Sequence, residues 1–241
     1  MKLADFKALS FDCYGTLIDW ETGIVAALQP LVRRSGTKMS REELLEAFGR
    51  FEHEIEEEHP SMLYSEVLML VHQHFSELLG VDDDQEERNA FGRSVGDWPA
   101  FPDSAEALQY LKQHFRLIIL SNVDRESFKG SNARLGVEFD CIFTAQDIGS
   151  YKPSLRNFHY MLDRLRQLGL EKSDLLHVAQ SLFHDHVPAN QVGIASAWID
   201  RRHDKDGGGA TVIPQHLPHF DFRFTSLGEL AAAHQSESAN A

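Results

Sequence analysis

Cysteine and basic residues are scarce in this sequence of 241 residues. Only two cysteines occur, Cys13 and Cys141, so a disulfide framework like those of small secreted domains is excluded. Both lie in or beside apolar runs and are interpreted as small buried residues. Lysine and arginine number 23 against 37 acidic residues, which gives a formal net charge of -14. Because such a charge repels a polyanion and no local basic stripe occurs, we expect no nucleic-acid partner.

Long apolar runs are also missing. No stretch reaches the roughly 20 apolar residues that a membrane-spanning helix needs, and the N-terminus lacks the pattern of a secretory signal peptide. We therefore expect no membrane partner and a cytoplasmic location. Hydrophobic residues nevertheless make up 42% of the chain and charged residues 25%, which is typical of a globular protein with a sizeable core.

A block of helical patterns occupies residues 17–98. Apolar residues recur there at helical spacing in four segments, which begin near Thr22, Ser40, Ser61 and Gln85. No strand pattern interrupts them, and the acidic run at residues 52–58 is interpreted as a solvated helix face. A helical block placed between two strand-bearing regions predicts an inserted, all-helical cap domain.

Strands and helices alternate in the rest of the chain. The predicted strands lie at residues 8–11, 115–120, 140–144, 175–179 and 195–199. This alternation predicts an α/β fold with a doubly wound parallel sheet and helices on both faces. The expected division is a core domain at residues 1–16 and 99–231, a helical cap domain at 17–98 and a disordered tail at 232–241.

A carboxylate stands where the first predicted strand ends. The apolar run at residues 8–11 leads into Asp12, and Gly15 and Thr16 follow. Open α/β sheets bind ligands at the carboxyl ends of their strands, so Asp12 is the first candidate for chemistry. Thr16 offers a hydroxyl and an amide beside it. The alternative is that Asp12 only caps the helix that follows.

Three further positions are candidates for the same crevice. Ser121 and Asn122 follow a strand just as Asp12 does, and their polar groups suit an anionic ligand. Lys152 lies in a loop before a helix, and Asp185 comes after another predicted strand. Taken alone, Ser121 and Asn122 are equally typical of a turn, and Lys152 is typical of a surface lysine.

Together these positions resemble a known family. The segments that match the four motifs of the haloacid dehalogenase superfamily are, in order, Asp12-Cys13-Tyr14-Gly15-Thr16-Leu17, Ser121-Asn122, Lys152-Pro153 and Asp185. Tyr14 stands where phosphatase members usually carry a second Asp, which is typical of the L-2-haloacid dehalogenase branch. The resemblance covers nearly the whole chain and implies a Rossmann-like core beneath a cap.

The resemblance also bears on cofactors. Magnesium-dependent relatives bind the metal through an Asp at the position that Gln180 occupies here. A neutral amide substitutes poorly for a carboxylate in the oxygen shell of a hard cation, and with Tyr14 this predicts a metal-independent reaction without a cofactor. His184 and His186 flank Asp185 and suggest zinc, but alternate residues of one turn converge poorly, which disfavours that alternative.

The resemblance implies a role for each candidate. Asp12 would displace halide from C2 of an L-2-haloalkanoic acid with inversion, and water would hydrolyse the ester to a 2-hydroxy acid. Lys152 would keep Asp12 ionised, and Asp185 would position Lys152 and help to activate water. The residues implied to bind the substrate are Tyr14, Thr16, Ser121, Asn122 and, as a cradle for the halide on the cap, Arg50. The alternative for Arg50 is an exposed surface arginine.

Three residues depart from the dehalogenase pattern. Gln180 and Leu182 replace polar residues before Asp185, and Phe158 stands where a Tyr is expected in the helix after Lys152. In the family these positions help to orient Asp, Lys and water. The expected function is a dehalogenase with a small 2-haloacid as its partner molecule. A magnesium-dependent phosphatase-like hydrolase and a catalytically silent protein remain the alternatives. The resemblance also makes a homodimer reasonable.

Overall fold

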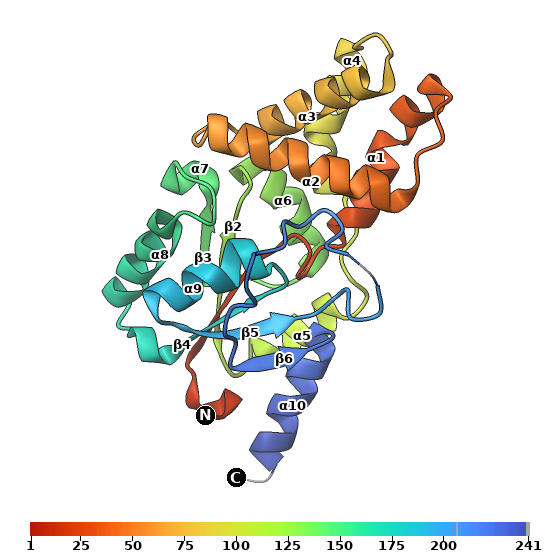
Figure 1. Cartoon of the computed structure of the whole chain (residues 1–241). Coiled ribbons are helices and arrows are strands. Elements are labelled where there is room, and N and C mark those ends of the chain that lie inside the picture. Colours follow the sequence, from red (N-terminus) through yellow and green to blue (C-terminus); the bar gives the residue numbers. More distant parts are fainter. Residues whose placement is uncertain (206, 240–241) are drawn as a thin grey trace.

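The structure is a computed structural model that describes residues 1–205 and 207–239. Its strands form one sheet in the order β3-β2-β1-β4-β5-β6, and the neighbouring strands pair in parallel. The strands are β1 (Ala8–Phe11), β2 (Arg116–Ser121), β3 (Cys141–Thr144), β4 (Leu175–Ala179), β5 (Ala195–Ile199) and β6 (Phe222–Phe224). The sheet grows outward from β1 in both directions, so the prediction of a doubly wound α/β fold is confirmed (Figure 1).

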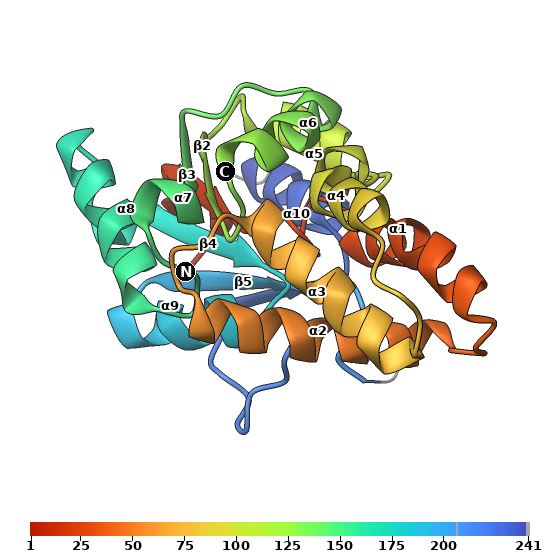
Figure 2. The same cartoon turned by 90° about the horizontal axis from the view of Figure 1, so that it is seen from above.

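Helices cover both faces of this sheet (Figures 1 and 2). The core helices are α5 (Ser104–Leu111), α6 (Arg125–Leu135), α7 (Ala145–Ile148), α8 (Leu155–Gln167), α9 (Val187–Val192) and α10 (Leu227–Ala239). Short turns of helix are η1 (Leu3–Asp5), η2 (Ser94–Asp97), η3 (Lys172–Asp174) and η4 (Leu182–His186). Successive residues of β1 join different hydrophobic clusters, with Leu9 on the side of α5 and α10 and Ala8 on the side of α8 and α9. This is the alternation expected of a strand buried on both faces.

The helical block follows β1 in the chain. Its helices are α1 (Trp20–Ser35), α2 (Arg41–Glu58), α3 (Tyr64–Leu79) and α4 (Gln85–Arg93). Helix α2 begins with a capping box, in which Ser40 Oγ accepts from the N–H of Glu43 and the Glu43 carboxylate accepts from the N–H of Ser40. Figure 1 shows these helices grouped beyond the carboxyl ends of the strands. They therefore lie over the edge of the sheet where ligands bind.

The end of the chain differs from the expectation. Helix α10 continues to Ala239, so the predicted disorder from residue 232 is wrong up to that point, and residues 240 and 241 lie outside the described residues. The physical reason is burial. Leu230 and Ala231 are buried, and Nδ1 of the buried His234 lies 2.8 Å from the hydroxyl of Tyr110 on α5. No helix within the described ranges is both long and apolar enough to cross a lipid bilayer.

Candidate active site

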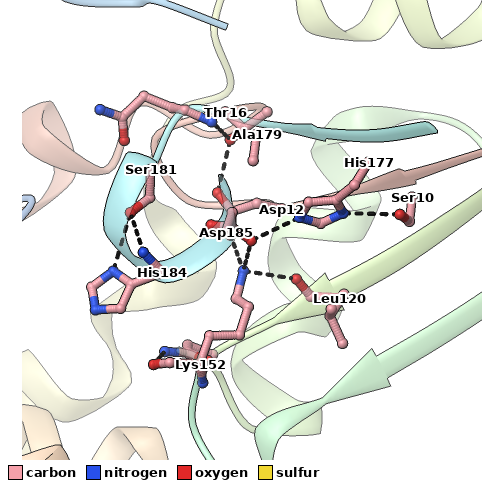
Figure 3. A network of polar contacts seen from close by, with 12 residues as sticks. Ser10, Asp12, Thr16, Leu120, Lys152, His177, Ala179, Ser181, His184 and Asp185 are labelled. Atoms are coloured by element: carbon pink, nitrogen blue, oxygen red, sulfur yellow. Dashed lines mark hydrogen bonds and ion pairs between the residues drawn. The ribbon is translucent and has the colours of Figure 1, made fainter. Parts of the chain in front are cut away.

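Asp12 directly follows β1 at the point where the order of strands reverses. Its side chain is 7% exposed, and both carboxylate oxygens have partners. Oδ1 accepts from Lys152 Nζ at 2.8 Å, and Oδ2 accepts from the hydroxyl of Thr16 at 2.8 Å (Figure 3). Gly15 has a φ of +91°, which lets the loop turn back so that Thr16 reaches Asp12. Asp12 is therefore held in one orientation.

Lys152 joins three elements of the core. Its Nζ is buried and donates to Asp12 Oδ1, to Asp185 Oδ1 at 2.7 Å and to the carbonyl of Leu120 at 3.1 Å. The surface alternative is therefore wrong for Lys152. Burial alone lowers the pKa of this amine, but the carboxylates of Asp12 and Asp185 outweigh burial and raise its pKa above the usual value. The ammonium group stays charged at neutral pH.

Asp185 lies in η4, after β4, and one of its oxygens accepts two hydrogen bonds. Oδ1 accepts from Lys152 and from His177 Nε2 at 2.9 Å, and His177 Nδ1 lies 2.9 Å from Ser10 Oγ. Oδ2 is buried and has no hydrogen-bond partner among the described residues. Burial alone raises the pKa of Asp185, but Lys152 and His177 outweigh it and hold the pKa well below the usual range.

The two carboxylates around Lys152 differ in their surroundings. Burial is the largest influence on Asp12 and raises its pKa, while the charge and hydrogen bond of Lys152 and the hydroxyl of Thr16 oppose it. Asp185 is held as an anion instead. Asp12 lies at the pocket wall with its oxygens fixed by Lys152 and Thr16, whereas Oδ1 of Asp185 is bonded by both Lys152 and His177. This arrangement therefore suits Asp12 to attack and Asp185 to support Lys152.

Asn122 positions the backbone of Lys152. Its Oδ1 accepts from the N–H of Lys152 at 2.7 Å, and its Nδ2 donates to the carbonyl of Lys152 at 3.0 Å. Ser121 is 2% exposed, its Oγ has no partner among the described residues, and it is not part of the pocket wall. The hydroxyl of Tyr14 lies 2.9 Å from Ser131 Oγ. The substrate-binding roles of Tyr14, Thr16, Ser121 and Asn122 stay predictions.

A small pocket, about 40 Å³ in volume, opens beside Asp12. The core contributes the catalytic candidates to its wall, and the helical block contributes Trp20, Glu52, Glu56 and Tyr64. Since a water needs roughly 10–15 Å³ of such a cavity, the pocket suits only a small molecule.

Arg50 does not reach this pocket. It is exposed on α2, and its guanidinium carbon lies 4.9 Å from the ring centroid of Phe51. The structure therefore contradicts the assignment of Arg50 to the halide site and supports the surface alternative. The reason is helical geometry: the buried face of α2 carries Phe48, Glu52 and Glu56 at intervals of four residues, and Arg50 points away from it.

The acidic run on α2 is not entirely a solvated face. Glu52 and Glu56 are each 7% exposed and line the pocket, which corrects the interpretation of residues 52–58 for these two positions. The hydroxyl of Tyr64 donates to Glu52 Oε1 at 2.5 Å. Burial raises the pKa of Glu52 to about 7, and burial together with Glu52 raises the pKa of Glu56 well above its usual value. The four-residue spacing of Phe48, Glu52 and Glu56 was the one signal in the sequence that these two glutamates are buried.

The residues around Asp12 do not fit a magnesium ion. Both carboxylates already share the ammonium of Lys152, and Gln180 presents an amide whose Oε1 accepts from Thr211 Oγ1 at 3.2 Å. Zinc fits no better. His186 lies against Ser196 and the carbonyl of Ala179, whereas His184 lies against Ser181. Across the described ranges, no group of three or more His, Cys, Asp or Glu side chains is arranged to hold a metal ion.

Comparison with known proteins identifies the family and the fold of the chain. A sequence model described as haloacid dehalogenase-like hydrolase matches residues 6–179, and no curated protein matches the chain. The solved L-2-haloacid dehalogenase from Xanthobacter autotrophicus is 18% identical, with a TM-score of 0.78 over 95% of this chain and 98% of that one. Its structure with chloropropionic acid covalently bound is 19% identical, with a TM-score of 0.76 over 95% and 98%.

A further solved structure is similar in fold. The HAD hydrolase YfnB from Bacillus subtilis, solved bound to magnesium, is 20% identical, with a TM-score of 0.74 over 95% of this chain and 98% of that one. At these identities the structural likenesses show the fold alone. The family model, in contrast, spans more than half of the sequence. The chain therefore belongs to the haloacid dehalogenase-like hydrolases.

Proposed function

We propose that this protein is a metal-independent hydrolase that acts on short L-2-haloalkanoic acids through an ester of Asp12. The observation that carries the proposal is the arrangement of Asp12, which is fixed by Lys152 and Thr16 at the wall of a small pocket. A carboxylate nucleophile needs an electrophilic carbon or phosphorus. Because the donor set does not fit magnesium, which would offset the charge of a phosphate dianion, carbon is the favoured target.

The reaction has two steps. In the first, a carboxylate oxygen of Asp12 forms a bond to C2 of the substrate, and the carbon–halogen bond breaks with its electron pair leaving as halide. In the second, water attacks the carbonyl carbon of the Asp12 ester, and the 2-hydroxy acid departs. Lys152 stabilises the carboxylate before the first step and after the second.

Two acceptors are suited to orient the attacking water. One of its protons passes to the departing oxygen of the 2-hydroxy acid, and the other leaves to solvent as Asp12 returns to the carboxylate. Asp185 Oδ2 and His184 Nε2 are buried without a partner among the described residues, and both residues line the pocket. Burial lowers the pKa of His184 to about 4, so its imidazole is neutral at pH 7 and can accept a hydrogen bond. With Arg50 outside the pocket, the indole N–H of Trp20 is a donor for the halide at the wall.

Labelling in heavy-oxygen water tests the ester directly. During single turnover of L-2-chloropropionate with EDTA present, we expect the heavy isotope to enter the peptide that contains Asp12, with release of one halide per turnover. Asp12→Asn should fold like the wild type and lose turnover. Unlabelled Asp12 during active halide release would refute the nucleophile. Magnesium-dependent cleavage of p-nitrophenyl phosphate would support the phosphatase alternative, and inactivity over a broad panel would support a silent protein.

A further inference from the structure

The cap side of the pocket is acidic. Glu52 and Glu56 lie one turn apart on α2, are almost completely buried and face the same pocket as Asp12. Figure 1 shows α2 above the carboxyl ends of the strands. Glu52 and Glu56 enter the pocket wall from this helix, and Asp12 and Asp185 enter it from the core. Together with Asp12 and Asp185, the pocket wall carries four carboxyl groups.

The charge of Lys152 reaches Glu56, but neither glutamate is held in an ion pair within the described residues. Neither Glu52 nor Glu56 forms an ion pair with any described lysine, arginine or histidine. Glu52 accepts from the hydroxyl of Tyr64, and Glu56 Oε2 accepts only a long hydrogen bond of 3.4 Å from Asn122 Nδ2. Lys152, the cation in the wall, is already shared by Asp12 and Asp185. Because buried carboxyls without a charged partner are costly, this side of the pocket favours a cationic ligand.

The core side of the pocket also carries an unsatisfied acceptor. Asp185 lines the pocket and is fully buried, yet its Oδ2 has no hydrogen-bond partner among the described residues. Buried acceptors are normally satisfied, so an unpartnered carboxylate oxygen in a pocket wall indicates that a ligand or water donates to it. The pocket therefore presents carboxyl acceptors from both sides.

We propose that Glu52 and Glu56 bind a protonated nitrogen of the substrate, so that the preferred substrates are short haloacids that carry an ammonium group. This inference rests on the proposed function, because it places the ammonium group beside the carbon that Asp12 attacks. A primary ammonium group has three N–H donors and one positive charge, which matches two carboxyls on adjacent turns. A simple haloalkanoate would bring one more negative charge into the pocket. In a haloacid that carries an ammonium group, the positive charge of the ammonium offsets that negative charge.

Binding of unreactive probes tests the ammonium site without turnover. The probes are 3-aminopropanoate and butanoate, which have the same number of heavy atoms and differ in the terminal ammonium or methyl group. By isothermal titration calorimetry at pH 8, we expect wild-type protein to bind 3-aminopropanoate at least about tenfold more tightly, a difference of about 1.4 kcal/mol. Equal or tighter binding of butanoate, or no binding of either probe, overturns the proposal.

Matched variants show whether the glutamates cause the preference. Glu52→Gln and Glu56→Gln keep the shape of the side chain and should each remove most of the preference for 3-aminopropanoate. Glu54→Gln, at an exposed position of the same helix, should leave it unchanged. Melting temperatures identify any variant that fails to fold. A preference that survives in both Glu52→Gln and Glu56→Gln overturns the assignment.

Turnover of a second matched pair separates the two proposals. We expect kcat/KM for halide release to be at least about tenfold higher for 3-amino-2-chloropropanoate than for 2-chlorobutanoate. If 2-chlorobutanoate labels Asp12 at equal or higher kcat/KM, the ester mechanism stands and the ammonium preference falls. If 3-aminopropanoate binds preferentially but neither substrate labels Asp12, the ammonium site stands and the proposed reaction falls.

Discussion

Lys152 is the residue on which the charge balance of the core side of the site depends. Its ammonium is buried between Asp12 and Asp185, so Lys152→Met leaves two buried carboxylates without a cation. Breaking a buried ion pair in this way costs about 3–5 kcal/mol. We expect a loss of that order in the free energy of unfolding at pH 7, measured by urea denaturation.

The same substitution has a defined pH dependence. Lys152 depresses the pKa of Asp185 in the folded protein. In the wild type the stability gained from this ion pair is therefore present above the pKa of Asp185 in the unfolded chain, and it is lost as the pH falls through the lower, folded pKa. Without Lys152, burial raises the pKa of both carboxyls. Their protonation at low pH removes the two buried charges and so reduces the destabilisation of the variant. The loss should therefore be smaller at pH 4 than at pH 7. Lys129→Met, an exposed control on α6, should change stability by less than about 0.5 kcal/mol at either pH. If the free energy of unfolding lost in Lys152→Met were the same at pH 4 and pH 7, the ion-pair explanation would be contradicted.

Glu52 gives the opposite pH dependence. Burial raises its pKa from 4.5 to about 7, so the wild type loses stability as the pH rises from 4.5 through 7. At about 1.4 kcal/mol per pKa unit, the cost approaches about 3 kcal/mol at pH 8. Glu52→Gln cannot ionise but can still accept from Tyr64. We expect the variant to unfold at higher urea concentration than the wild type at pH 8 and near the same concentration at pH 4. A lower midpoint at pH 8 would show that the carboxylate form is stabilising.

Residue patterns identified the core side of the site but missed most of the cap side. Asp12, Lys152 and Asp185 were predictable because each follows a strand or precedes a helix in a recognisable motif. Glu52 and Glu56 were not, since an acidic run on a helix is usually solvated and only the packing of α2 over the pocket shows which of its members are buried. Sequence gives the spacing of side chains on α2, but the pose of that helix depends on tertiary contacts.

At the scale of elements, the position of α2 depends on a close approach at Gly49. A Cβ at this position would lie 2.4 Å from the carbonyl oxygen of Ala210, so Gly49→Ala forces α2 and the 207–211 loop apart. Overpacking of this kind costs about 1–3 kcal/mol. We expect Gly49→Ala to lose stability in that range and to weaken 3-aminopropanoate binding, because Glu52 begins the next turn. Glu54→Ala, on the exposed face of α2, is the control. Unchanged binding in a folded Gly49→Ala variant would show that the loop, not α2, gives way.

Helices and strands without a strong apolar pattern were not predicted from the sequence. Helix α6 is capped by Asp124, whose side chain accepts from the N–H of Ser127, but it buries only Phe128, Ser131 and Leu135. Strand β6 has three residues and depends on its pairing with β5. Short or polar elements of this kind acquire their stability from neighbours, so local hydrophobic periodicity does not identify them.

For the whole molecule, alternation of strands and helices was enough to predict the doubly wound sheet, since parallel strands need crossover helices. The meeting of α2 with the carboxyl end of β2 was not predictable in the same way. It joins Glu56 to Asn122 across 66 positions of the chain, at the long 3.4 Å contact. Long-range contacts of this kind depend on the docking of the helical block on the sheet.

The charge of the whole molecule decides how metal dependence must be tested. With a formal net charge of -14, the surface attracts divalent cations without any specific site, so bulk binding of magnesium carries no information about the reaction. The rate does. Because the ammonium of Lys152 is shared by Asp12 and Asp185 and Gln180 offers only an amide, we expect halide release to be unchanged by EDTA and by added magnesium. Potassium chloride at matched ionic strength controls for screening of the surface charge. A rate that collapses with EDTA and returns with magnesium alone would require a metal at Asp12 and would overturn the metal-independent mechanism.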